Sequence, residues 1–147
     1  MKKLLLMMAA AMITSLAFAQ KMNEKDVPAE VKVAFTEQFT GATATKWEKE
    51  KGQYEVEFVW NKKEQWALFD ERGNLVETEV EVLLTDLPQG VLAYMKTHYV
   101  SEKIKEATRI TNGKGVVTYE VEIKGKDLIF DSNGRFVEEE AVKEKED

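Results

Sequence analysis

The chain has 147 residues and no cysteine, and its 21 basic and 27 acidic residues give a formal net charge of −6. The lack of cysteine excludes disulfide bonds, cysteine nucleophiles and thiolate metal sites, so a packed core must stabilise the fold. The acidic balance disfavours nucleic acid and anionic membrane surfaces as partners. With only one histidine, a zinc site is not expected, and we predict no metal and no cofactor.

Residues 1–19 have the order of a secretory signal peptide. Lys2 and Lys3 precede an uncharged apolar run that ends in the small-residue tripeptide Ala17-Phe18-Ala19. The run is shorter than the roughly 20 apolar residues of a spanning helix, so we expect cleavage near Ala19 and no membrane anchor. The remaining 147 − 19 = 128 residues would carry a charge of 19 − 27 = −8. The mature protein is therefore expected to be periplasmic or secreted.

After residue 19, three motifs occur twice in the same order, at offsets of 60, 65 and 61 residues. The pairs are Asp26-Val27-Pro28 with Asp86-Leu87-Pro88, Tyr54-Glu55-Val56-Glu57-Phe58 with Tyr119-Glu120-Val121-Glu122-Ile123, and Phe69-Asp70-Glu71-Arg72-Gly73 with Phe130-Asp131-Ser132-Asn133-Gly134. Such recurrence indicates an internal repeat. We predict a first repeat at 20–83, a second at 84–142 and a charged tail at 143–147, with both repeats in one structural domain.

Each repeat is predicted to open with a short helix, because proline suits the first helical turn. In the first repeat an apolar stripe at i, i+4 and i+8 follows Pro28, and an equivalent stripe follows Pro88 in the second. These stripes are expected to pack in the core. Their residues are Val31, Phe35 and Phe39, and Val91, Met95 and Tyr99.

Four strands are predicted after each helix, joined by tight turns at 70–73 and 131–134. In Tyr54-Glu55-Val56-Glu57-Phe58 the alternation places apolar side chains on one sheet face and glutamates on the other. The fold class is therefore α+β, with two tandem α-β4 units forming an antiparallel sheet and helices packed on one face. The predicted strands are Thr43–Glu50, Gln53–Trp60, Glu64–Phe69 and Asn74–Val82, then Ile104–Thr111, Val116–Lys124, Asp127–Phe130 and Arg135–Ala141.

The Tyr-Glu-Val-Glu strands, the Phe-Asp-x-x-Gly turns, the two-fold layout and the signal peptide together resemble the exported PepSY-like family. That family is similar in fold to the β-lactamase inhibitor protein. The resemblance implies one curved antiparallel sheet with helices behind it, and a binding or inhibitor-like role instead of catalysis. It does not extend to inhibition of β-lactamase, because the β-lactamase inhibitor protein relies on disulfides and this chain has no cysteine.

Candidate catalytic residues are few. His98 falls at the edge of the second helix stripe, where we expect a partly buried structural histidine. The pair Glu55 and Glu57, or Glu120 and Glu122, would lie about 6 to 7 Å apart on one strand face, a separation that glycosidases use. Alternating glutamates are also typical of any solvated sheet face, so we predict that the protein is not an enzyme and has no catalytic residue.

Several apolar residues share the face of the glutamates. If Ala67 and Phe69 point into the core, Trp66 and Leu68 point to the solvent-facing side, where they would form a protein-binding patch. A β-bulge between Glu64 and Phe69 would instead invert the alternation and bury Trp66. The predicted partner-binding residues share the solvent-facing side of the sheet and are Trp66, Leu68, Val59, Ile129, Glu55, Glu57, Glu120 and Glu122.

Leu75 and Val76 place apolar residues on both faces of the fourth strand and leave its phase undecided. The function predicted from these features is an exported, non-catalytic binding module, inhibitor-like, whose partner is an unidentified envelope or secreted protein. An alternative is a periplasmic module that binds a small ligand or a cation through the acidic face. The expected oligomeric state is a monomer or a weak dimer, since an edge strand could pair with a second copy.

Overall fold

The computed structural model describes residues 19–141, so the expected signal peptide, apart from Ala19, and the charged tail at 143–147 lie outside the described residues. These described residues form two α-helices, two single-turn 3-10 helices and nine strands. In chain order they are β1 (Gln20–Met22), η1 (Glu24–Asp26), α1 (Ala29–Gln38), β2 (Thr43–Glu50), β3 (Gln53–Trp60), β4 (Lys63–Phe69), β5 (Leu75–Glu81), η2 (Leu84–Asp86), α2 (Gln89–His98), β6 (Glu106–Asn112), β7 (Val117–Ile123), β8 (Lys126–Asp131) and β9 (Phe136–Ala141).

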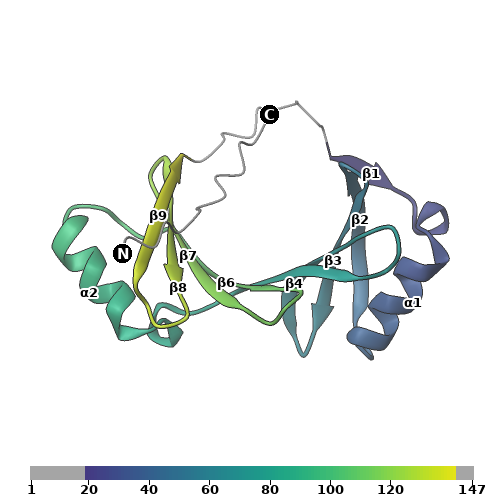
Figure 1. Cartoon of the computed structure of the whole chain (residues 1–147), viewed down its shortest axis with the longest axis horizontal. Coiled ribbons are helices and arrows are strands. Elements are labelled where there is room, and N and C mark those ends of the chain that lie inside the picture. Colours follow the sequence, from purple (N-terminus) through teal and green to yellow (C-terminus); the bar gives the residue numbers. More distant parts are fainter. Residues whose placement is uncertain (1–18, 142–147) are drawn as a thin grey trace, which may run out of the picture.

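The nine strands form one antiparallel sheet in sequence order, from β1 to β9. The pairing of β5 with β6, from Glu77 opposite Asn112 to Glu81 opposite Thr108, joins the first half of the chain to the second. The sheet is strongly curved, with α1 behind one end and α2 behind the other (Figure 1). Both helices therefore lie on the outer, convex face, and no helix of residues 19–141 lies on the inner, concave face. The predicted antiparallel α+β architecture is confirmed.

Each helix begins directly after its proline, and its apolar stripe packs against the sheet. Val31, Phe35 and Phe39 of the first half are buried, and the ring of Phe35 meets the edges of Trp47 and Phe58 at centroid distances of 5.6 and 5.2 Å. Val91 and Met95 are buried in the same way in the second half. Each end of the sheet thus has its own core on the convex side.

The Phe-Asp-x-x-Gly motif docks a hairpin against the helix of its own half. The Asp70 carboxylate accepts hydrogen bonds from the backbone N–H groups of Arg72 and Asn74, both at 2.9 Å, which holds the turn in shape. Gly73 has a φ of +81°, and a Cβ at this position would lie 2.7 Å from the carbonyl oxygen of Glu30. Glycine is required there because the turn touches the helix backbone.

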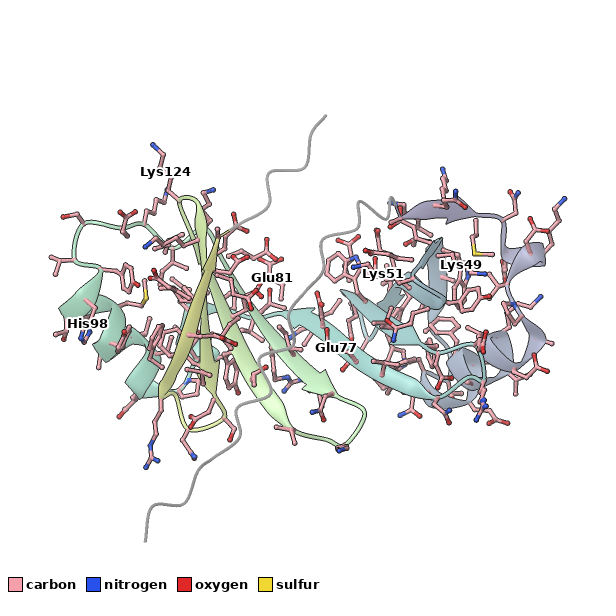
Figure 2. The ribbon with its side chains drawn as sticks, turned by 45° about the horizontal axis from the view of Figure 1, so that its top comes forward. Lys49, Lys51, Glu77, Glu81, His98 and Lys124 are labelled. Carbon is pink, nitrogen blue, oxygen red and sulfur yellow. The ribbon has the colours of Figure 1, made fainter. Side chains whose placement is uncertain are left out.

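The structure differs from the sequence-based predictions at β1 and His98, and it decides one alternative that the sequence left open. Strand β1 was not predicted, since three residues are too short for a periodic pattern. His98 is exposed instead of partly buried, because it ends α2 on the solvent side (Figure 2). Its ring stacks on that of Tyr94 at a centroid distance of 4.1 Å. The bulge considered between Glu64 and Phe69 is absent from the β3–β4 pairing, whose register is continuous. A register shift occurs instead between β4 and β5, next to Leu68 and Phe69.

Candidate binding surface

Trp66 lies on the concave face in a cross-strand row with two glutamates. Its neighbours are Glu57 on β3 and Glu79 on β5, and the row continues to Ile110 on β6. Trp66 is half-buried, so part of the indole ring is accessible from the concave side. Because no bulge interrupts β4 before this position, the alternation of the strand directs Trp66 away from the helix-covered core.

Leu68 occupies the equivalent place in the adjacent row. It pairs with Glu55 on β3 and with Glu77 on β5, and all three side chains are half-buried. Figure 2 shows Glu77 and Glu81 extending from β5 in the middle of the molecule. A small depression of about 30 Å³ lies between the two rows and is lined by Trp66, Leu68 and the glutamates beside them. This volume has room for only a few water molecules.

The second half repeats this arrangement of an aliphatic side chain between carboxylates. Ile129 on β8 pairs with Glu120 on β7 and with Glu138 on β9. Val59 shares the face but lies near its border, 42% exposed, opposite Thr43. The structure thus brings together all eight side chains of the predicted patch on one face, although Val59 and Ile129 lie toward opposite ends of it.

Glu79 is the most strongly perturbed carboxyl group in the first half of this face. Burial, a hydrogen bond with Glu77 and the negative charges of Glu77 and Glu106 together raise the pKa of Glu79 to about 7. Burial between Trp66 and Ile110 is the largest of these effects. The ionised form of Glu79 is thus disfavoured by its surroundings.

Glu120 is perturbed in the same direction in the second half. Burial raises its pKa to about 7, and the charges of Asp127 and Glu79 add to the effect. Burial also raises the pKa of Asp127, with a further contribution from Glu122. The two halves therefore share one continuous field of negative charge across the β5–β6 junction.

Few cations neutralise this field. Within residues 19–141, the ion pairs formed by lysines of this face are Lys46 with Glu48 at 2.6 Å and Lys105 with Glu122 at 3.2 Å. Neither pair includes Glu79 or Glu120. A partner that supplies positive charge to the centre of the face would consequently relieve an existing repulsion.

Two further observations concern metal ligands and cavity size on this face. No cluster of three or more His, Asp or Glu side chains in the described part of the chain is placed to hold a metal ion. The depression beside Trp66 is too small for an organic substrate. The chemistry that this face does offer is an apolar and aromatic contact surrounded by carboxylates.

The predicted patch omitted several residues that the structure places in it. Glu79 lies opposite Trp66 and Glu77 opposite Leu68. Ile110 lies opposite Glu79, and Asp127 lies opposite Glu122. The alternation Glu77-Thr78-Glu79-Val80-Glu81 could have assigned the glutamates to the concave face. Leu75 and Val76 obscured that signal, because the register shift between β4 and β5 changes the phase of the strand at this point.

The profile of the beta-lactamase-inhibitor-like, PepSY-like family matches residues 17–68 and 58–138 of the chain. No curated protein matches the sequence. Solved structures with a similar fold include a DUF2874 family protein from Bacteroides uniformis, with 17% identity, coverage of 81% of this chain and 92% of the other, and a TM-score of 0.73. A BLIP-like protein from Bacteroides fragilis has 24% identity, coverage of 82% and 90%, and a TM-score of 0.69.

A protein from Bacteroides eggerthii described as periplasmic has 14% identity, coverage of 79% of this chain and 89% of its own, and a TM-score of 0.72. At these identities the likeness concerns the fold alone. Over residues 19–141, neither helix has the length and the apolar character needed to cross a membrane.

Proposed function

Because the chain belongs to the beta-lactamase-inhibitor-like, PepSY-like family, we propose that it is a non-catalytic binding module that engages a protein partner through its concave face. The observation that carries the proposal is the Trp66 row, in which an accessible indole lies between Glu57 and Glu79, and neither glutamate forms an ion pair within residues 19–141. Aromatic anchors at the centre of a patch commonly contribute most of the binding energy of protein interfaces.

The chemistry of the face indicates what kind of partner fits. Trp66 and Leu68 provide the apolar contact, and Glu77, Glu79 and Glu120 provide negative charge. The partner is therefore a protein surface with an apolar residue surrounded by lysine or arginine side chains. Binding of such a surface should keep Glu79 and Glu120 ionised and should weaken at high salt.

The two halves contribute unequally in this proposal. We treat them as copies of one α-β4 unit, and the offset of 61 residues then relates Leu68 to Ile129 and Trp66 to Asp127. The second copy therefore has a carboxylate where the first has the tryptophan. The first half would supply the anchor and the second half would supply charge.

The proposed location is the cell envelope, in the periplasm or outside the cell. It rests on the sequence of residues 1–19, which lies outside the described residues except for Ala19, and on the periplasmic description of the Bacteroides eggerthii protein. The small-ligand alternative has less support on this face, because the depression beside Trp66 holds about 30 Å³.

Affinity capture from an envelope extract tests the proposal. The bait is the full-length gene product, purified after export, and it is compared with Trp66→Lys. Val33→Lys is the matched control, since Val33 is an exposed apolar residue of α1, 55% accessible, on the convex side. We expect a protein that the parent and Val33→Lys recover and Trp66→Lys does not. Recovery by all three baits alike would contradict binding through the concave face.

If a recovered protein is an enzyme, its activity should be measured with and without the parent bait. A fall in activity that Trp66→Lys fails to produce would establish an inhibitor-like role. Unchanged activity would leave a binding module that does not inhibit.

A further inference from the structure

The convex face contains a groove of about 440 Å³ between the two helices. It can be followed along one cross-strand row, which runs from Phe58 through Gln65, Val80, Arg109 and Tyr119 to Phe130. Both ends of the row are buried under a helix, whereas its middle is half-buried or exposed. The groove is thus the part of the convex face that neither helix covers, at the junction of the two halves.

One wall of the groove is a fixed aromatic ring. The indole Nε1–H of Trp60 donates a hydrogen bond to the carbonyl oxygen of Thr40 at 3.0 Å, and the ring meets Phe39 edge-on at 5.4 Å. The two-residue turn at Asn61 and Lys62, both with positive φ, places Trp60 directly opposite Lys63. This hairpin therefore presents an aromatic ring and a cation side by side.

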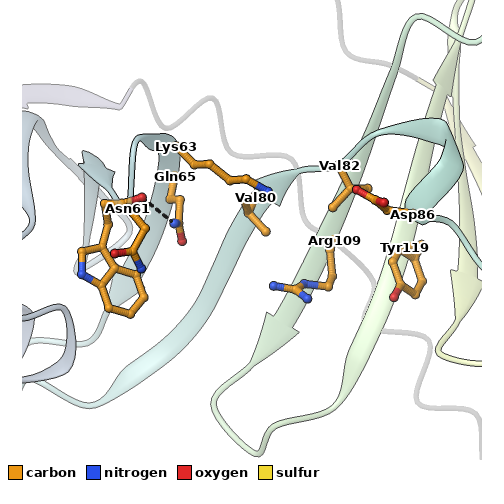
Figure 3. Close-up of a pocket in the computed structure, with 9 residues that line it drawn as sticks. Asn61, Lys63, Gln65, Val80, Val82, Asp86, Arg109 and Tyr119 are labelled. Atoms are coloured by element: carbon orange, nitrogen blue, oxygen red, sulfur yellow. Dashed lines mark hydrogen bonds between the residues drawn. The ribbon is translucent and has the colours of Figure 1, made fainter.

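A second cation reaches the groove from the other half of the chain. Figure 3 shows Arg109 and Lys63 directed into the groove from β6 and β4, with Val80 between them. Neither cation forms an ion pair with another residue of 19–141. Asp86 is the one acidic residue of the lining (Figure 3), so the groove has a formal charge of 2 − 1 = +1 in a chain of charge −6.

We infer that this groove binds a small aromatic acid, an organic anion with a planar apolar body. Lys63 and Arg109 would hold the anionic group, since neither forms an ion pair with an acidic residue of the described range 19–141. Trp60, Val80 and Tyr119 would contact the planar body. The volume lies within the usual range of small-molecule sites. This site is separate from the concave face and does not depend on the function proposed for it.

The three tryptophans of the chain allow a direct test. Trp47 lies in the core, Trp60 lines the groove and Trp66 lies on the concave face. The exported full-length product, labelled with 15N, is titrated with 8-anilinonaphthalene-1-sulfonate, and the three indole N–H resonances are followed after assignment by Trp→Phe variants. We expect the Trp60 resonance to shift with saturation while the Trp47 and Trp66 resonances stay in place.

Charge recognition is tested with two matched comparisons. N-phenyl-1-naphthylamine has the same rings without the sulfonate and should bind about tenfold more weakly or worse. Arg109→Gln should weaken binding of the sulfonate about tenfold, whereas Lys124→Gln should change it less than twofold. Lys124 is the control because it lies 61 residues after Lys63, at the tip of the β7–β8 hairpin and outside the groove lining (Figure 2).

The carboxylate 1-naphthoate should displace the sulfonate probe, and the neutral 1-naphthamide should not. An unchanged Trp47 resonance verifies that each variant is folded, and Lys63→Gln replaces Arg109→Gln if that variant fails this check. A shift of Trp66 in place of Trp60, equal effects of Arg109→Gln and Lys124→Gln, or equal binding of the neutral analogue would each overturn the proposal.

Discussion

The two faces of the central sheet differ in the sign of their charge although the same strands build both. On the concave side β5 presents Glu77 and Glu79, and on the convex side it presents Val80 beside Arg109. Each face also has its own tryptophan, Trp66 on the concave side and Trp60 on the convex side. Because side chains alternate along a strand, one nine-stranded sheet can support two binding surfaces of opposite character.

The helices determine which face of the sheet is accessible at each place along it. At the two ends of the sheet the convex face is buried under α1 and α2, and only the concave face is accessible (Figure 1). In the middle both faces are accessible. In the middle of the sheet, a surface residue of either face can therefore be replaced without disturbing a helix-covered core.

The largest expected effect comes from opening a cavity in the core between the sheet and α1. Phe58 is fully buried and packs edge-on against Phe35 at 5.2 Å. Phe58→Ala should lower the free energy of unfolding by about 3 to 5 kcal/mol, as measured by chemical denaturation, because it leaves a cavity among aromatic rings. A loss below about 1 kcal/mol would mean that the first core is not packed as described.

Disturbing the contact between the Gly73 turn and α1 should have the next largest effect on the free energy of unfolding. Gly73→Ala requires both a strained positive φ and a shift of the nearby Glu30 carbonyl, so we expect a loss of about 2 to 3 kcal/mol. Gly115→Ala is the control, since Gly115 has a φ of +80° but no atom within 4 Å of the added Cβ. Its loss should be about 1 kcal/mol. Equal losses would show that the Gly73 turn does not dock on α1.

Glu79, on the concave face, is expected to make the free energy of unfolding of the protein depend on pH. Its pKa is raised from 4.5 to about 7, so the folded protein holds this proton more tightly than the unfolded chain. The resulting stabilisation is complete below pH 4.5 and is lost as the pH rises through 7. Glu79→Gln should therefore be more stable than the parent at pH 8, by about 1 kcal/mol after allowance for solvent screening, and nearly equal at pH 4.

Thermal unfolding across this pH range provides the measurement. Glu81→Gln serves as the comparison, because Glu81 is an exposed glutamate of the same strand. If the two variants follow the same pH profile, burial of Glu79 beside Trp66 has no energetic consequence.

The smallest effect is expected at the border of the concave face. Lys105 and Glu122 form an ion pair at 3.2 Å in which both side chains are partly exposed. Lys105→Gln should change the free energy of unfolding by less than about 0.5 kcal/mol, because solvent screens such pairs. A loss above 1 kcal/mol in denaturant titrations would show that peripheral ion pairs, and not packing, hold this face together.

The sequence predicted the features that depend on local periodicity. Val31, Phe35 and Phe39 recur with the spacing of a helix face, and Glu55 and Glu57 alternate with buried residues. These patterns predicted the helices and eight of the nine strands, but they left open the side of the sheet on which Trp66 lies, which the continuous β3–β4 register decides. Strand β1 escaped prediction because three residues carry no period.

The features that were not predicted depend on contacts between distant residues. The register shift opposite Leu75 is set by the pairing of two strands, not by either sequence alone. Lys63 and Arg109 meet in one groove only because β5 pairs with β6. The raised pKa of Glu79 likewise requires its burial among neighbouring strands, and single-sequence reasoning does not supply burial.

Binding of the protein recovered by affinity capture, compared between the parent, Trp66→Lys and Val33→Lys, tests the central claim most directly. Trp66→Lys should weaken binding at least thirtyfold, the effect of losing about 2 kcal/mol at an interface anchor. Val33→Lys and the groove variant Arg109→Gln should bind within about twofold of the parent. Equal affinity of Trp66→Lys and the parent would contradict the assignment of the concave face as the binding surface.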